Sequence, residues 1–141
     1  MELHLYRFRI LATRNDIGYG TSKIMKVGEK IPVSASFVDT TLIHHTAEQG
    51  WQSTDLLPFN RNNMRYRTMH DVEAQWHTHF DTDELFFVLS GDLEVDIRGA
   101  DGEITTYNLG PLQMLAVHPG CEHRARSKGL TTLIVIDAIS K

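Results

Sequence analysis

Cysteine is almost absent from this chain, which has one, Cys121, among its 141 residues. A single thiol cannot form a disulfide within the chain, and low cysteine usage agrees with a reducing compartment. The first residues also lack the basic and apolar regions of a signal peptide. We therefore expect a cytoplasmic protein.

Long apolar runs and clusters of basic residues are lacking as well. No stretch approaches the roughly 18 apolar residues of a membrane span, and the formal net charge of -4 comes without a basic run that could neutralise a phosphate backbone. We expect neither a membrane nor a nucleic acid as partner. A composition of 41% hydrophobic and 23% charged residues is typical of a globular protein, and the length fits one domain.

The second half of the chain contains short strand-like segments with turn signals about every ten residues, which indicates an all-β sandwich or barrel. In the segment over 93–98 apolar residues alternate with charged ones, which predicts one buried face and one wet face that carries Asp96. The predicted strands of this half cover 64–69, 74–79, 84–89, 93–98, 103–109, 113–117, 123–126 and 131–139.

The first 60 residues are predicted to be extra N-terminal strands that pack on a core over 61–141 or on a partner subunit, within one structural domain. Strands are expected over 3–11, 22–27 and 31–38, whereas 40–51 mixes extended and helical signals and stays open. A proline and three asparagines favour a loop over 55–63. Because edge strands often pair across subunits, we expect a homodimer.

The most informative pattern is His77-Thr78-His79 followed by Glu84 and Gly91. Side chains two apart on an extended strand point to the same face, so the two imidazoles can be neighbours, and Glu84 can return from the next strand. His123, just past a Pro-Gly turn, is the natural fourth partner. Imidazole and carboxylate ligands suit one divalent transition metal, and Fe, Zn, Mn, Ni and Co all remain open.

These residues resemble the two motifs of the cupin superfamily, G-x5-H-x-H-x3to4-E-x6-G and G-x5-P-x-G-x2-H-x3-N. The resemblance covers roughly residues 64 to 138 and implies a jelly-roll β-barrel with a metal held by the four ligands. Its departures fall at turn and scaffold positions. Asp71 replaces the leading glycine of the first motif, while in the second His118 replaces the proline, Gly110 lies two places early and Ser127 occupies the asparagine position.

An octahedral ion with three imidazoles and one carboxylate would keep two positions open for substrate or water. We therefore expect a metal-dependent enzyme that acts on a small oxygen-rich organic molecule, with a slight preference for the oxidative chemistry of the cupins that resemble quercetin dioxygenases. Lewis-acid isomerisation, epimerisation, cyclisation or lyase chemistry is the first alternative. A non-catalytic small-molecule binding module and metal-free proton transfer are the others.

The residues that line such a site are less certain from sequence. On the strand over 64–69, alternate positions face opposite ways, and the sequence does not choose the inward face. One face carries Arg65, Arg67 and Met69. The other candidates for lining the site are Tyr66, Thr68, His70, His118 and Trp76.

Overall fold

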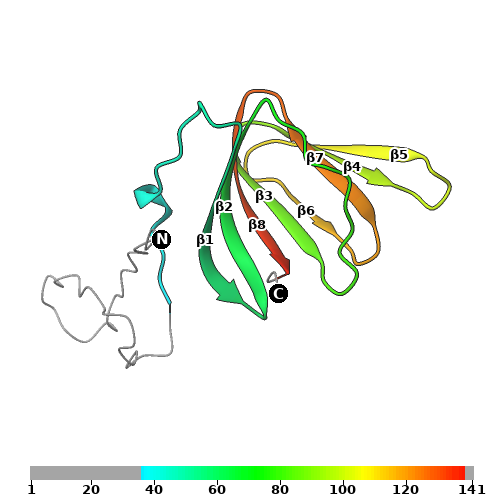
Figure 1. Cartoon of the computed structure of the whole chain (residues 1–141), viewed down its shortest axis with the longest axis horizontal. Helices are drawn as coiled ribbons and strands as arrows, with labels where there is room; N and C mark the ends of the chain where they lie inside the picture. The colour runs from blue at the N-terminus through cyan, green and yellow to red at the C-terminus, as the bar shows by residue number, and fades with distance from the viewer. Residues whose placement is uncertain (1–35, 139–141) are drawn as a thin grey trace, which may run out of the picture. The chain divides into compact units, whose positions relative to one another are not determined.

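The computed structural model describes residues 36–138, which fall into two units over 36–43 and 44–138 (Figure 1). In the first unit, a short 3-10 helix, η1 (Thr40–Leu42), begins after Asp39, whose carboxylate accepts a hydrogen bond from the Thr41 backbone N–H at 3.0 Å. The strands predicted over 3–11, 22–27 and most of 31–38 lie outside the described residues. Within 36–138 no helix has the length and hydropathy needed to cross a bilayer.

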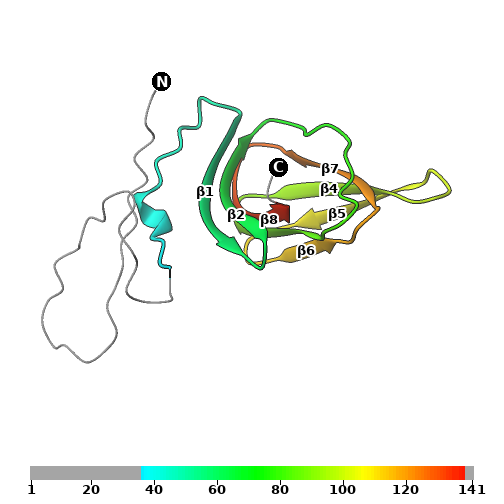
Figure 2. The same ribbon diagram turned by 60° about the horizontal axis from the view of Figure 1, so that its bottom comes forward.

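The second unit consists of two antiparallel sheets. The larger has the strand order β1-β2-β8-β3-β6, and the smaller the order β5-β4-β7. Figures 1 and 2 show the smaller sheet facing one end of the larger. This confirms the predicted all-β fold, in the two-sheet arrangement of a jelly roll. The strands are β1 (Trp51–Phe59), β2 (Asn62–His70), β3 (Glu84–Ser90), β4 (Leu93–Arg98), β5 (Ile104–Leu109), β6 (Met114–Val117), β7 (Glu122–Ser127) and β8 (Leu130–Ala138).

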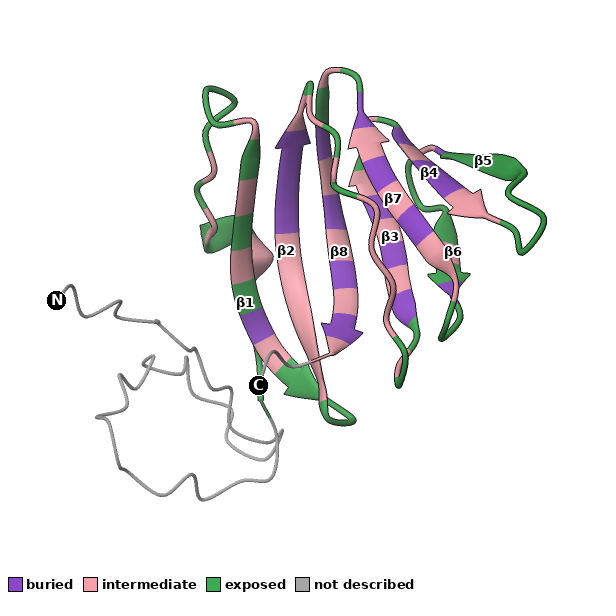
Figure 3. Cartoon of the chain, turned by 45° about the vertical axis from the view of Figure 1, so that its right-hand side comes forward, coloured by how far each residue is buried: buried purple, intermediate pink, exposed green. Residues whose placement is uncertain are grey.

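The core is built from alternate residues of both sheets. Along β8 every second residue is buried, and β3 follows the same rule, which appears as stripes in Figure 3. Full burial of a large apolar side chain contributes about 1.5–3 kcal/mol, so this alternation fixes which face of each strand points inward. The buried apolar cluster comprises Met69, Phe86, Val88, Leu93, Val95, Leu109, Val117, Ala125, Leu133 and Val135.

The loop predicted over 55–63 is wrong. β1 and β2 pair almost to their ends and are joined by a two-residue turn, in which Asn60 and Arg61 have φ of 49° and 65°. Positive φ at both central residues is the geometry of the tightest hairpin turns, which asparagine tolerates well. Pro58 fits within β1 because β1 is an edge strand, where a missing backbone N–H can be accommodated.

The strand predicted over 74–79 is an extended segment without a continuous ladder. It meets β7 at two isolated bridges, Glu73 with Arg126 and His77 with His123. From one bridge to the other the chain advances by four residues along the segment but by only three along β7. The segment therefore contains one extra residue, which interrupts the register. The segment is nonetheless held along β7, because the Ala74 N–H donates to the Ala125 carbonyl at 2.8 Å.

The face of β4 predicted to be wet carries a buried acid. Asp96 is among the buried residues, where it accepts hydrogen bonds from Thr106 Oγ1 at 2.7 Å and Arg124 Nε at 3.0 Å, and from Arg126 Nη1. The guanidinium of Arg124 also lies over the Trp76 ring, 4.8 Å from its centroid. The outer face of the smaller sheet is therefore a network of paired charges rather than a freely solvated surface.

Candidate metal centre

Two of the four predicted ligands come from the extended segment beside β7. The His77 N–H donates to the His123 carbonyl at 3.0 Å, and the His123 N–H donates back to the His77 carbonyl at 2.9 Å. The His79 carbonyl accepts from the Gly120 N–H at 2.8 Å. These backbone bonds fix the segment where its two imidazoles turn toward β3.

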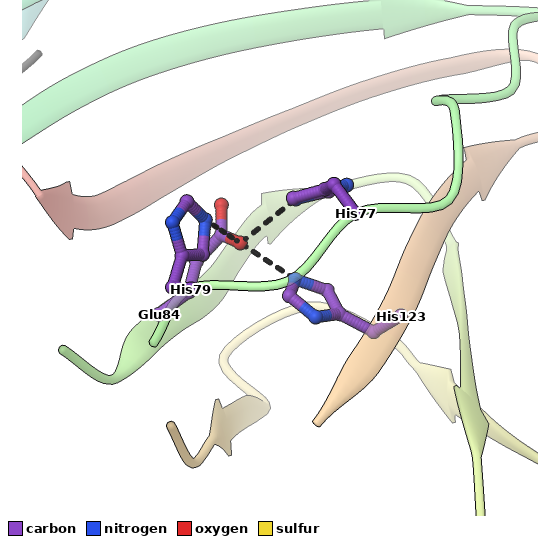
Figure 4. A group of neighbouring side chains, drawn as sticks. All are labelled: His77, His79, Glu84 and His123. Atoms are coloured by element: carbon purple, nitrogen blue, oxygen red, sulfur yellow. Dashed lines mark hydrogen bonds and ion pairs between the residues drawn. The ribbon is translucent and has the colours of Figure 1, made fainter. Parts of the chain in front are cut away.

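The other two ligands come from facing sheets. Glu84 is the first residue of β3 in the larger sheet, and His123 lies on β7 in the smaller. Figure 4 shows the three imidazoles converging on one carboxylate oxygen, Glu84 Oε2. The Nε2 atoms lie 3.3 Å (His77), 3.1 Å (His79) and 2.7 Å (His123) from it. One ligand atom from each residue lies within 4.8 Å of all the others, so the structure brings the whole predicted set together.

The donor set fits a transition metal. Nδ1 of His77 lies 2.9 Å from the Gln75 carbonyl, and Nδ1 of His123 lies 3.0 Å from the Cys121 carbonyl. A carbonyl can only accept, so Nδ1 carries the proton and, in the neutral ring, Nε2 presents a lone pair. Lone pairs that face a carboxylate oxygen repel it unless a cation or protons lie between them. At metal–ligand lengths of about 2.1 Å, adjacent ligands of an octahedral ion stand about 3 Å apart, close to the distances from Glu84 Oε2 to the three Nε2 atoms.

Burial divides the cluster into a closed side and an accessible side. Glu84 is 3% exposed and His123 is 1% exposed, whereas His77 and His79 are only partly buried. A fully buried carboxylate without a counter-charge would be costly, so Glu84 needs the imidazoles or an ion. A ligand from solvent would approach from the side of the two less buried histidines.

Electrostatics in the metal-free cluster follow from these contacts. Burial by itself would raise the pKa of Glu84, but hydrogen bonds from His123 and His77 outweigh it and hold that pKa well below its ordinary value. The hydrogen bond to Glu84 raises the pKa of His77 against the opposing effect of burial. The carboxylate is thus ionised at neutral pH and available to a cation.

The other candidate residues lie in separate surroundings. Thr68 Oγ1 is 2.8 Å from Nδ1 of His45, and the Tyr66 ring is 5.4 Å from the same imidazole. Nδ1 of His70 lies 2.6 Å from the Ala47 carbonyl. His118 is exposed and contacts Asp83 at 2.7 Å. Among the described residues, no hydrogen bond, ion pair or ring contact joins these four side chains to the cluster. The Trp76 ring packs against the guanidinium groups of Arg98 and Arg124, whose Cζ atoms lie 4.1 Å and 4.8 Å from its centroid.

The opposite face of β2 holds residues that sequence reasoning left undecided. Met69 is in the core, and Arg65 donates to Asp137 on β8 at 2.7 Å. Arg67 shares this face with Met69 and pairs with Leu133, both in the core, so this face of β2 points inward. Period-two alternation had grouped the β2 residues correctly, but Asp137 had no sequence signal because its burial depends on pairing between β2 and β8.

One departure from the motif has a structural explanation. Asp71, where the motif has glycine, adopts φ of 51°. This left-handed conformation favours glycine, although aspartate tolerates it better than most residues. The Asp71 carboxylate accepts from the Gly129 N–H at 2.7 Å, which stabilises the turn that the substitution would otherwise strain.

Two facing antiparallel sheets with this cluster between them define the class of the protein, and comparison with known families agrees. A family model described as a cupin domain matches residues 67–139, about half of the chain and all four cluster residues. The chain belongs to the cupin family.

Particular relatives are more distant. An uncharacterized protein of Bacillus subtilis (strain 168), YdbB, is 34% identical over 65 residues, which are 46% of this chain and 54% of that protein. The match thus spans about half the length of the curated relative.

Solved structures show the same fold. A cupin-2 domain containing protein from Shewanella frigidimarina aligns with a TM-score of 0.56 and 25% identity over 64% of this chain and 83% of that one. A cupin superfamily protein from Desulfitobacterium hafniense aligns with a TM-score of 0.59 and 19% identity, covering 79% of this chain and 97% of that one. The second likeness concerns the fold alone.

Proposed function

We propose that the protein is a metal-dependent cupin enzyme that acts on a small oxygen-rich organic molecule. The observation that carries the proposal is the convergence of four ligand atoms within 4.8 Å, three from imidazoles and one from a buried carboxylate. A closed structural site commonly satisfies a metal with protein ligands alone, whereas four ligands on a six-coordinate ion leave two positions for substrate or water. The partly exposed His77 and His79 keep one side of the cluster accessible.

The chain's own residues would have two tasks in this activity. His77, His79, Glu84 and His123 would hold the ion, which supplies Lewis acidity or, if redox-active, electron transfer. The carbonyls of Gln75 and Cys121 would keep the His77 and His123 rings in the tautomer that presents Nε2. We favour oxidative chemistry, with Lewis-acid isomerase, epimerase, cyclase or lyase chemistry as the alternative.

Elemental analysis of protein purified without a nickel column tests the metal. We expect close to one equivalent of a transition metal, iron on the oxidative branch and zinc, manganese or nickel on the Lewis-acid branch. Oxygen uptake with a panel of small diols, enols and hydroxy acids then separates an oxidative enzyme from the alternatives. Metal content below a tenth of an equivalent, with none gained on reconstitution, would refute the proposal.

One observation favours a metal-free alternative. Three imidazoles hydrogen-bonded to one ionised carboxylate are also a proton-transfer array. The double variant His77→Ala with Glu84→Gln should abolish both metal binding and turnover of any substrate found in that panel. Activity that survives in the metal-free wild-type protein would favour proton transfer.

We also propose a homodimer. Among the described strands β1 is an outer strand of the larger sheet, and both of its terminal aromatic residues, Trp51 and Phe59, are exposed. Unpaired strand edges with exposed aromatic side chains are common places for two subunits to meet. Small-angle scattering at micromolar concentration should give twice the 16.1 kDa mass of one chain. A monomeric mass would contradict this.

A further inference from the structure

Arg67 is a buried cation on the core face of the larger sheet. It lies on β2, where it pairs with Leu133 of β8, and Met69 is its neighbour on the same face of the strand. Leu133 and Met69 both belong to the apolar core. Only 8% of its surface is exposed. Long charged side chains are seldom buried to this degree unless a partner satisfies them.

Within the described residues this partner is missing. The Nε atom of Arg67 is buried without a hydrogen-bond partner, and the rest of its guanidinium group forms no hydrogen bond or ion pair with a described residue. The guanidinium lies over the Trp51 ring, with Cζ 4.5 Å from the ring centroid. Arg65, two residues away on the same face, donates to both Asp55, at 3.0 Å, and Asp137, at 2.7 Å. A buried donor without an acceptor destabilises the fold, because it has lost its hydrogen bond to water and gained none in return.

Arg67 shares the inward face of the larger sheet with the carboxylate of the cluster. Arg67 pairs with Leu133, which pairs with Val88, and Val88 and Glu84 are alternate buried residues of β3. Glu84 and Asp137 attract the positive charge of Arg67, and the same charge acts on His77. Asp137 accepts from Arg65 through Oδ2, while its buried Oδ1 has no hydrogen-bond partner. The three imidazoles all contact Oε2 of Glu84, and neither carboxylate forms a hydrogen bond with Arg67. Trp51, which covers the guanidinium, is 41% exposed, so this end of the face adjoins solvent.

From this geometry we infer that Arg67 binds the carboxylate of a small organic acid, whose second oxygen-bearing group reaches the metal cluster. The inference rests on the proposed function and names its substrate class. The planar fork of a guanidinium matches a carboxylate with two parallel hydrogen bonds, one of them from the orphaned Nε–H. A phosphate dianion fits less well, because Asp137 and Glu84 place two negative charges nearby, and the neighbouring cation, Arg65, already donates to Asp55 and Asp137.

Nuclear magnetic resonance of the side-chain Nε–H of Arg67 tests the inference directly. The full-length protein, labelled with 15N and loaded with Zn2+, would be titrated with lactate and mandelate and with their neutral amides, lactamide and mandelamide. Absence of the signal in Arg67→Lys assigns it. We expect the acids, but not the amides, to shift this signal as the N–H gains an acceptor, and an affinity for the acids at least about tenfold above that for the amides.

Two variants separate recognition by Arg67 from a general effect of charge. Arg67→Gln should weaken acid binding about tenfold or more while keeping its zinc. Arg61→Gln removes the same charge from the exposed β1–β2 turn and should bind the acids as the wild type does. Circular dichroism and zinc content show that each variant is folded and loaded. For a variant that fails to fold, the wild-type comparison of acid with amide still decides.

The inference is overturned if neither acid shifts the Arg67 signal in the loaded wild-type protein, or if Arg67→Gln binds the acids with wild-type affinity. Failure of the proposed function is recognised separately, since it appears as absence of zinc in the wild-type protein before any acid is added. The same titration in metal-free protein should show the Arg67 shift at higher acid concentration, because Glu84 then lacks a compensating cation.

Discussion

At the scale of single residues, Glu84 is the only anion among the four grouped ligands. Glu84→Gln keeps the size of the side chain but removes the charge that attracts a cation. We expect the affinity for Zn2+ to fall by roughly two orders of magnitude or more, because a neutral amide is a poor ligand for this ion. Competition with a chromophoric chelator measures the change.

His118→Ala is the control for that experiment. His118 is also a histidine near the second motif, but its ring is exposed and contacts Asp83 instead of the cluster. Its removal should leave zinc affinity unchanged. An equal loss in both variants would mean that the metal binds elsewhere.

Asp96 supports a prediction on stability and pH. Burial alone would raise its pKa, but hydrogen bonds from Thr106, Arg124 and Arg126 outweigh this and hold the pKa below its ordinary value of 3.8. The unfolded chain therefore binds a proton more readily, and this contribution to stability is present above about pH 4 and lost as the pH falls through the folded-state pKa.

Asp96→Asn should accordingly lower the free energy of unfolding by about 1–3 kcal/mol at pH 7. Urea denaturation at pH 7 and at pH 3 should show that the difference from wild type shrinks on acidification. Glu103→Gln, which changes an exposed acid, should shift the free energy by less than about 0.5 kcal/mol at either pH. A difference that grows at low pH would contradict the assigned role.

The residue scale also shows what the sequence could and could not predict. The grouping of the three histidines and Glu84 was predictable, because the chemistry and spacing of these residues are local and unusual. Alternation correctly placed Asp96 on the other face of β4 from Leu93 and Val95, and that face was expected to be solvated. Its burial depends on Arg124 and Arg126, which lie on β7 and reach it only after β4 and β7 pair.

At the scale of elements, the turn after β3 shows why the first motif ends in glycine. Gly91 has φ of 76°, and a Cβ placed on it would lie 2.3 Å from the Leu130 carbonyl oxygen. Gly91→Ala should therefore lower the free energy of unfolding by about 3 kcal/mol, through backbone strain and a contact that cannot relax without moving β8. Urea denaturation measures the change.

Gly102→Ala is the matched control for Gly91→Ala. Gly102 has φ of 85° but no atom within 4 Å of an added Cβ, so the substitution introduces the backbone strain without the clash. We expect a loss of about 1 kcal/mol. Equal losses at both positions would show that the approach of Gly91 to β8 contributes nothing.

Strands were predictable from 84 onward because apolar alternation and turn residues agree there. The two errors arose where pairing overrode local preference. Pro58 and the asparagines looked like a loop, but an edge strand and a two-residue turn accommodate them. The segment over 74–79 looked like a strand, yet its register against β7 contains one extra residue.

At the scale of the whole molecule, the proposed metal binding would stabilise the fold. A ligand that binds only the folded state at 100 times its dissociation constant adds about 2.7 kcal/mol, which raises the melting temperature of a chain this size by roughly 8 °C. We expect such a rise when Zn2+ is added to chelator-treated protein. Differential scanning calorimetry measures it, and Glu84→Gln should show little change. A wild-type melt unaffected by zinc would contradict the linkage.

The ligands of the cluster are divided between the two layers, with Glu84 on the larger sheet and His123 on the smaller. A cation held there would cross-link the two sheets. The chain has one thiol, Cys121, and therefore cannot cross-link them with an internal disulfide. Separation of the two sheets and release of the ion would then occur together. The rate at which a chelator removes the metal would then measure how often the two sheets separate.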